Sequence, residues 1–162
     1  MGTVLTHPKK GDLGHFLYKY SKKNRRFNLD LFNRNRSIEE VKQLSPLTWA
    51  YVGDAVYELY IRTYLINTTK LKPHELHIKS IKYVKAKAQA ELLQQLEEIL
   101  TDEEKDIVRR GRNTQTHHIA KNATVQDYMY ATAFEALIGY LYLTKQDERI
   151  KELLDYLIQN AK

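Results

Sequence analysis

Two acidic residues stand in segments of this sequence that are otherwise apolar and helical in pattern. Asp54 lies in the segment 51–56 (YVGDAV), and Glu135 is the one charged residue of 133–141 (AFEALIGYL). Charged side chains are rarely buried unless they are paired or bind a metal. Two carboxylates from separate helices are sufficient for Mg²⁺, which keeps several waters in its shell. Asp54 and Glu135 are therefore candidate catalytic residues and metal ligands, with an ion pair to a basic side chain as the structural alternative.

A glycine accompanies each acid within its helical segment. Gly53 precedes Asp54, and Gly139 follows Glu135 by one helical turn. Glycine in a helix interior costs about 1 kcal/mol relative to alanine, so we expect another group to approach the backbone at Gly53 closely. On the helix pattern alone, an exposed Asp54 without any ligand remains the simpler interpretation.

Other groups that could carry chemistry lie near a polar stretch, 112–123, that has no periodicity. Arg109, Arg110 and Arg112 suit phosphate binding, but the helix dipole favours cations at a helix C-terminus in any protein. From the residues alone these two interpretations are about even. The adjacent histidines 117–118 and the spaced pair 74 and 77 favour loop, capping or surface roles over metal ligation.

The elements that must position these residues are helices. An apolar 3.6-residue period runs through the segment that begins at Ser45-Pro46, and no segment alternates over strand length, so we predict an all-α fold. That period comprises Leu47, Ala50, Tyr51, Ala55, Leu59 and Ile66. Further helices are predicted from the capping boxes at 37–40 and 101–104, from Lys72-Pro73 to about 100 with one break, from Thr124 to about 143, and over 148–159.

Composition and charge indicate how the chain is organised into domains. The 162 residues suit one domain, and the absence of cysteine excludes disulfides and thiolate chemistry. No apolar run could span a membrane and no secretory signal is recognisable, so cytoplasmic residence is the default expectation. The net charge of +6 falls entirely within residues 1–45. We predict a basic, poorly ordered arm at 1–36 and a catalytic domain at 37–162. The arm is either a solvated terminus or a contact for a polyanion.

Several of these segments together resemble a known family. The segment 51–56 resembles the signature helix of the ribonuclease III catalytic domain, and 134–141 resembles its second acidic helix. RRGRN at 109–113, KN at 121–122 and VQ at 125–126 are similar to Mini-ribonuclease III, the branch without a double-stranded-RNA-binding domain. The resemblance covers residues 44–157.

The resemblance implies a ribonuclease III catalytic-domain-like helical bundle that is homodimeric, with two sites facing one RNA duplex. Asp54 and Glu135 match the family's metal-binding positions, where Mg²⁺, or Mn²⁺ in its place, activates water for attack on a phosphodiester. The implied substrate is double-stranded RNA, specifically the precursor of large ribosomal RNA, recognised through phosphates and A-form shape. The implied RNA-binding residues are Arg109, Arg110, Arg112, Asn113 and Lys121.

The chain departs from the larger family at two positions. Ala50 stands where ordinary ribonuclease III enzymes have a glutamate, and Thr132 stands where they have an aspartate. The Mini-III branch shares this reduction, which predicts a weaker metal site that binds tightly only with substrate present. Two classes of function remain: a double-stranded-RNA endoribonuclease, and a catalytically silent RNA-binding or ribosome-assembly protein. The retained Asp54 and Glu135 favour the enzyme.

Overall fold

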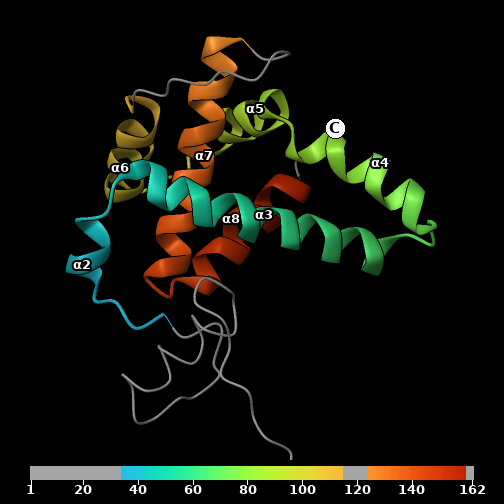
Figure 1. Ribbon diagram of the computed structural model, residues 1–162, viewed down its shortest axis with the longest axis horizontal. Coiled ribbons are helices and arrows are strands. Elements are labelled where there is room, and N and C mark those ends of the chain that lie inside the picture. Colours follow the sequence, from blue (N-terminus) through green and yellow to red (C-terminus); the bar gives the residue numbers. More distant parts are fainter. Residues whose placement is uncertain (1–33, 115–123, 160–162) are drawn as a thin grey trace, which may run out of the picture. The chain divides into compact units, whose positions relative to one another are not determined.

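The computed structural model describes residues 34–114 and 124–159, and this part of the chain is helical without any strand, as predicted (Figure 1). The compact unit to which these residues belong begins at Arg34. The basic arm up to residue 33, the histidines 117–118 and Lys121 lie outside the described residues. The helices are α2 (Ile38–Lys42), α3 (Pro46–Thr68), α4 (Pro73–Val84), α5 (Ala86–Leu96), α6 (Asp102–Arg112), α7 (Val125–Leu143) and α8 (Asp147–Gln159).

The capping signals set where the helices begin. Ser37 and Glu40 form a reciprocal capping box, and so do Thr101 and Glu104. The Ser45 hydroxyl caps α3 with proline at its first position, and the Thr124 hydroxyl accepts from the Asp127 N–H at the start of α7. The predicted break after 72 falls at Lys85, which separates α4 from α5. These helix starts are confirmed, while α6 runs one residue past the predicted end at Gly111.

Helix α7 is the centre of the bundle. Its residues 131–134 and 136–141 are all buried, and α3, α5 and α6 pack around it (Figure 1). Trp49 of α3 meets Tyr140 edge to face at 5.4 Å between ring centroids, and Tyr57 meets Phe134 in the same way at 4.9 Å. These aromatic pairs hold α3 across α7 and therefore fix the register of the residues between them.

Helix α3 has two apolar faces, and the predicted period mostly traces the outer one. Leu47, Tyr51, Ala55, Leu59 and Ile66 are exposed, and of the predicted set only Ala50 is buried. The buried face comprises Trp49, Ala50, Gly53, Tyr57, Ile61 and Leu65. The period correctly indicated a helix, but it could not tell which apolar face meets α7.

Two ion pairs fasten the ends of the bundle. Arg149 of α8 donates to both carboxylate oxygens of the buried Glu104, at 2.8 and 2.9 Å, and to the Ile99 carbonyl oxygen. The Arg34 guanidinium donates two hydrogen bonds to the two carboxylate oxygens of Asp147, at 2.6 and 2.8 Å, in a bidentate ion pair. None of the described helices is both long enough and apolar enough to cross a membrane.

Candidate metal centre

The two mid-helix glycines form the closest contact between α3 and α7. A Cβ atom on Gly53 would lie 1.8 Å from the carbonyl oxygen of Glu135, and one on Gly139 would lie 1.8 Å from the carbonyl oxygen of Trp49. Glycine therefore lets the two backbones touch where α3 crosses α7 (Figure 1). This confirms the expected close approach at Gly53. Because Asp54 follows Gly53 and the touched carbonyl belongs to Glu135, both acids stand at one crossing point.

The two carboxylates differ in exposure. Asp54 is exposed on α3, whereas Glu135 is partly buried in α7. Burial, and then the negative charge of Asp54, raise the pKa of Glu135 to about 7. Partial burial and the charge of Glu58 raise the pKa of Asp54 as well. The charged form of each carboxylate is therefore disfavoured at this place, and a shared cation would relieve the repulsion between them.

A third polar side chain reaches this place from α5. Gln89 is 1% exposed. Its amide lies close to the Glu135 carboxyl and lowers the pKa of Glu135, which opposes part of the increase that burial causes. By hydrogen-bond geometry, however, its Nε2 atom has no partner among the described residues. A buried donor in that state costs about 1–3 kcal/mol. Sequence reasoning missed Gln89, although it stands four residues before the buried Leu93 on the inner face of α5.

These side chains fit a small divalent cation that prefers oxygen. Neither Asp54 nor Glu135 forms an ion pair with any basic side chain in the described ranges, so the ion-pair alternative has no partner there. Within the same ranges no three acidic, histidine or cysteine side chains gather as a metal site. Two carboxylates suffice for Mg²⁺, which leaves the remaining ligand positions to water and substrate oxygens.

Uncharged side chains occupy the two positions where the resemblance leads one to expect further carboxylates. Ala50 stands one turn before Asp54 on α3, and Thr132 stands one turn before Glu135 on α7. Both residues are 5% exposed. Because neither side chain carries charge, the crossing point holds two carboxylates rather than four. The donor set is thus poor in negative charge for a metal centre.

The predicted RNA-binding arginines at the end of α6 already have partners within the chain. Arg109 pairs with Asp106. Arg110 lies 4.4 Å from the centre of the Trp49 ring and donates to the Lys42 carbonyl oxygen, and Arg112 faces the Tyr130 ring at 5.8 Å. Asn113 is exposed at the C-terminal end of α6. Arg110 therefore has a structural contact in addition to its predicted role.

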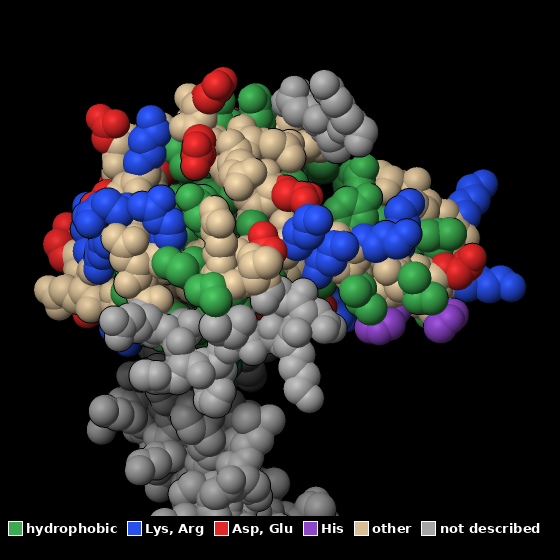
Figure 2. Space-filling model, turned by 90° about the horizontal axis from the view of Figure 1, so that it is seen from above, with side chains coloured by type: hydrophobic (Ala, Val, Ile, Leu, Met, Phe, Trp, Pro, Cys, Tyr) green, Lys and Arg blue, Asp and Glu red, His purple; other side chains and the backbone are tan. Residues whose placement is uncertain are grey.

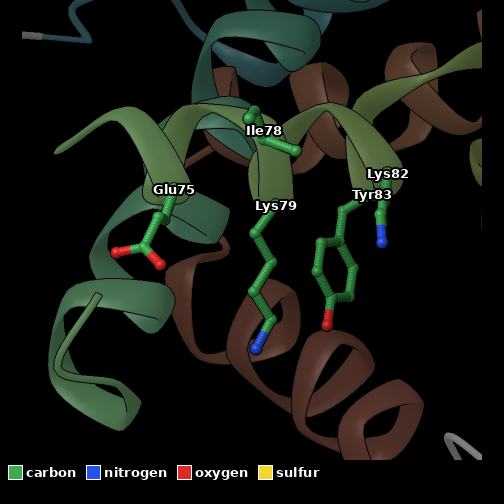
Figure 3. Close-up of a pocket in the computed structure, with 5 residues that line it drawn as sticks. All are labelled: Glu75, Ile78, Lys79, Lys82 and Tyr83. Atoms are coloured by element: carbon green, nitrogen blue, oxygen red, sulfur yellow. The ribbon is translucent and has the colours of Figure 1, made fainter. Parts of the chain in front are cut away.

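A second basic surface, which the sequence reasoning overlooked, lies on α4 and the start of α5. Residues 70–87 hold six lysines and two histidines against one acid. Figure 2 shows Lys, Arg and His side chains gathered over the α4 end of the molecule. Glu75, Lys79 and Tyr83 extend from one side of α4 and line a hollow of about 320 Å³ (Figure 3). A charge count in short windows would have found this segment.

Comparison with known proteins agrees with this arrangement. The Ribonuclease III domain family model matches residues 47–146. Mini-ribonuclease 3 of Enterococcus faecalis is 50% identical over 126 residues, which cover 76% of this chain and 96% of that protein. The Staphylococcus aureus Mini-ribonuclease 3 is 50% identical over 126 residues, covering 76% and 94%. A crystal structure of a Fusobacterium nucleatum protein aligns with a TM-score of 0.68 at 32% identity, covering 76% and 98%.

The helical bundle and the matching family model together define the class of protein. The chain belongs to the ribonuclease III family. Within that family its half-identical relatives are Mini-ribonuclease III proteins, which confirms the branch that the sequence motifs resemble.

Proposed function

We propose that this chain, an endoribonuclease of the ribonuclease III family, cleaves double-stranded RNA with Mg²⁺ held by Asp54 and Glu135. The observation that carries the proposal is the glycine-mediated crossing of α3 and α7, which brings two carboxylates together without a basic partner in the described part of the chain. When bound there, Mg²⁺ activates water and stabilises the charge that develops on the phosphate. Asp54 and Glu135 supply the ligands, and burial of Glu135 makes its carboxylate favour a cation over solvent.

The positively charged surfaces support a duplex RNA substrate. The α4 segment carries lysines, and the end of α6 carries Arg109, Arg112 and Asn113. Lysine and arginine bind the phosphate backbone and release its counterions, and double-stranded RNA is recognised mainly by shape and phosphate contacts. Arg110 and Lys121 belong to the same proposed RNA surface, and we infer that Arg110 also anchors the end of α6 on Trp49. The basic arm predicted at 1–36 adds further positive charge that we assign to RNA binding.

The outer face of α3 supports a homodimer. Tyr51 is 83% exposed, Leu59 is 60% exposed and Ile66 is 63% exposed. Exposed apolar side chains on one helix face are typical of a protein–protein contact. The Glu58–Arg62 ion pair lies among them on this face, and the occupant here is a second copy of the chain. Asp54 stands between Tyr51 and Leu59 on this helix, so the two sites of a dimer would lie near the shared interface and could act on one duplex.

The natural substrate that we propose is the precursor of large ribosomal RNA, processed in the cytoplasm. This rests on the family resemblance, and Mn²⁺ is expected to replace Mg²⁺ because both prefer oxygen ligands. A catalytically silent RNA-binding or ribosome-assembly role is the alternative, and the experiment below separates the two.

The test is cleavage of a long duplex RNA in Mg²⁺ by the wild-type chain and by the Asp54→Asn and Glu135→Gln variants. Each substitution keeps the shape of the side chain but removes a charged ligand, so we expect the cleavage rate to fall more than about 100-fold. RNA binding should persist in both variants. Asp102→Asn, which makes the same change on the exposed start of α6, is the matched control and should cleave normally.

Two results would contradict the proposal. If Asp54→Asn and Glu135→Gln cut as fast as the wild type, these carboxylates do not hold the metal. If the wild-type chain binds the duplex but cuts it in neither Mg²⁺ nor Mn²⁺, the silent RNA-binding function replaces the enzymatic one.

A further inference from the structure

Gln89 is a polar group that the proposed mechanism does not yet use. It lies on the inner face of α5, 1% exposed, in line with the buried Leu93 and Leu96. Position 89 is thus a core position, where proteins usually place an apolar side chain. A glutamine amide brings two N–H donors and one acceptor into that place.

The Gln89 amide lies close to the Glu135 carboxyl, because α5 packs against α7 at this place. Its Nε2 atom is without a hydrogen-bond partner among the residues that the structure describes. A carboxylate is a strong hydrogen-bond acceptor. A hydrogen bond from the amide to the Glu135 carboxylate would therefore satisfy the buried Nε2 donor that lacks a partner among the described residues.

We propose that Gln89 is a positioning residue for the metal centre, holding the Glu135 carboxylate toward Asp54 through one Nε2–H. The second N–H is left for a water molecule at the site. The inference rests on the proposed metal site at Asp54 and Glu135.

The buried amide of Gln89, unpaired among the described residues, lowers the stability of the fold, and packing alone would not favour a glutamine at this position. If Gln89 served only the fold, replacing it with leucine would be expected to disturb the core. If it serves the metal centre, Gln89→Leu removes an unpaired donor from an apolar environment and should raise the melting temperature of the metal-free protein. Metal affinity and fold stability should therefore move in opposite directions.

The experiment measures Mn²⁺ binding by the full chain, from the electron paramagnetic resonance signal of the free ion, for wild type, Gln89→Leu and Asp54→Asn. Polar groups that orient a metal ligand contribute a factor of about 10–100 in metal affinity. We expect Gln89→Leu to weaken Mn²⁺ binding about tenfold. The Mg²⁺ concentration for half-maximal RNA cleavage should rise by a similar factor, while the metal-free melting temperature does not fall. Gln89→Met, which keeps the unbranched shape, repeats the test if the leucine variant does not fold.

The outcomes separate this inference from the proposed function. If Asp54→Asn loses Mn²⁺ binding while the Gln89 variants keep wild-type affinity, the positioning role is wrong and the metal site stands. A metal-free melting temperature that falls in both Gln89 variants, with unchanged Mn²⁺ affinity in the folded protein, would make Gln89 a structural residue only. If Asp54→Asn itself binds Mn²⁺ like the wild type, the proposed metal site fails, and this inference fails with it.

Discussion

At the scale of single residues, Glu135 couples metal binding to pH. Burial and the Asp54 charge raise the pKa of Glu135 to about 7, so near neutral pH about half of the molecules carry a proton on this carboxyl that a cation must displace. The Mg²⁺ requirement should therefore decrease as the pH rises through 7. The opposite trend would mean that Glu135 is not a metal ligand.

The same pKa makes a prediction about stability without metal. Because the pKa of Glu135 in the folded chain is above the unfolded value of 4.5, burial of the charged form destabilises the fold. The penalty is absent below pH 4.5 and grows to at most about 3 kcal/mol as the pH passes 7. Glu135→Gln should match the wild type near pH 4.5 and be more stable at pH 8 in urea unfolding. An equal difference at both pH values would contradict the burial account.

Which site residues can be predicted from sequence depends on how they contrast with their neighbours. Asp54 and Glu135 are conspicuous because each is an acid among apolar residues. Gln89 is not, because it stands among alanines and lysines on a helix that is polar elsewhere. Only the fold shows that its side of α5 faces α7, and the pairing of Arg110 with Trp49 is hidden for the same reason.

At the scale of elements, the crossing of α3 and α7 depends on its glycines. A methyl group at Gly53 or Gly139 would lie 1.8 Å from a backbone carbonyl oxygen of the other helix, which cannot move aside alone. Gly53→Ala and Gly139→Ala should therefore destabilise the fold by about 3 kcal/mol, although alanine favours the helix by about 1 kcal/mol. Chemical unfolding measures this loss.

Gly111 is the matched control for this prediction. A Cβ atom there would meet Ala133 Cα at 2.9 Å and the Ala136 Cβ at 3.0 Å, contacts that a small helix shift can relieve. Gly111→Ala should cost clearly less than the other two substitutions. A rank order with Gly111→Ala as the most damaging would contradict the close crossing of α3 and α7.

The helices themselves were largely predictable, since their starts carry local signals. Serine and threonine caps, and proline at the first position of α3 and α4, act within a single turn. Which face of α3 packs inward was not predictable in the same way. Both faces carry apolar side chains, and the choice is made by Trp49 and Tyr57 fitting against α7, a contact between distant segments.

At the scale of the whole molecule, the second apolar face of α3 predicts self-association. A charge at Leu59 or Ile66 would be buried without a partner in a dimer, so Leu59→Asp and Ile66→Asp should produce monomers in sedimentation analysis. Ile81→Asp places the same charge on an exposed apolar position of α4 and is the control. If the wild-type chain is already monomeric, or both variants remain dimeric, this face is not the dimer contact.

Positive charge is concentrated in two segments of the chain, although the sequence totals reveal only the first. The excess lies in residues 1–45, and the remainder is neutral as a sum. That neutral sum conceals the lysine-rich segment 70–87, whose charge is balanced by acids on other helices (Figure 2). An RNA duplex responds to the local surface rather than to the total, so the α4 segment belongs in the proposed interface.

The central claim is that Asp54 and Glu135 jointly hold the catalytic cation. It is tested most directly by the anomalous density of Mn²⁺ in crystals of the chain with an uncleavable RNA duplex. The account predicts one strong peak in contact with both carboxylates, with water and phosphate oxygens as the other ligands. A peak elsewhere, or a basic side chain between the two carboxylates in place of the metal, would contradict it.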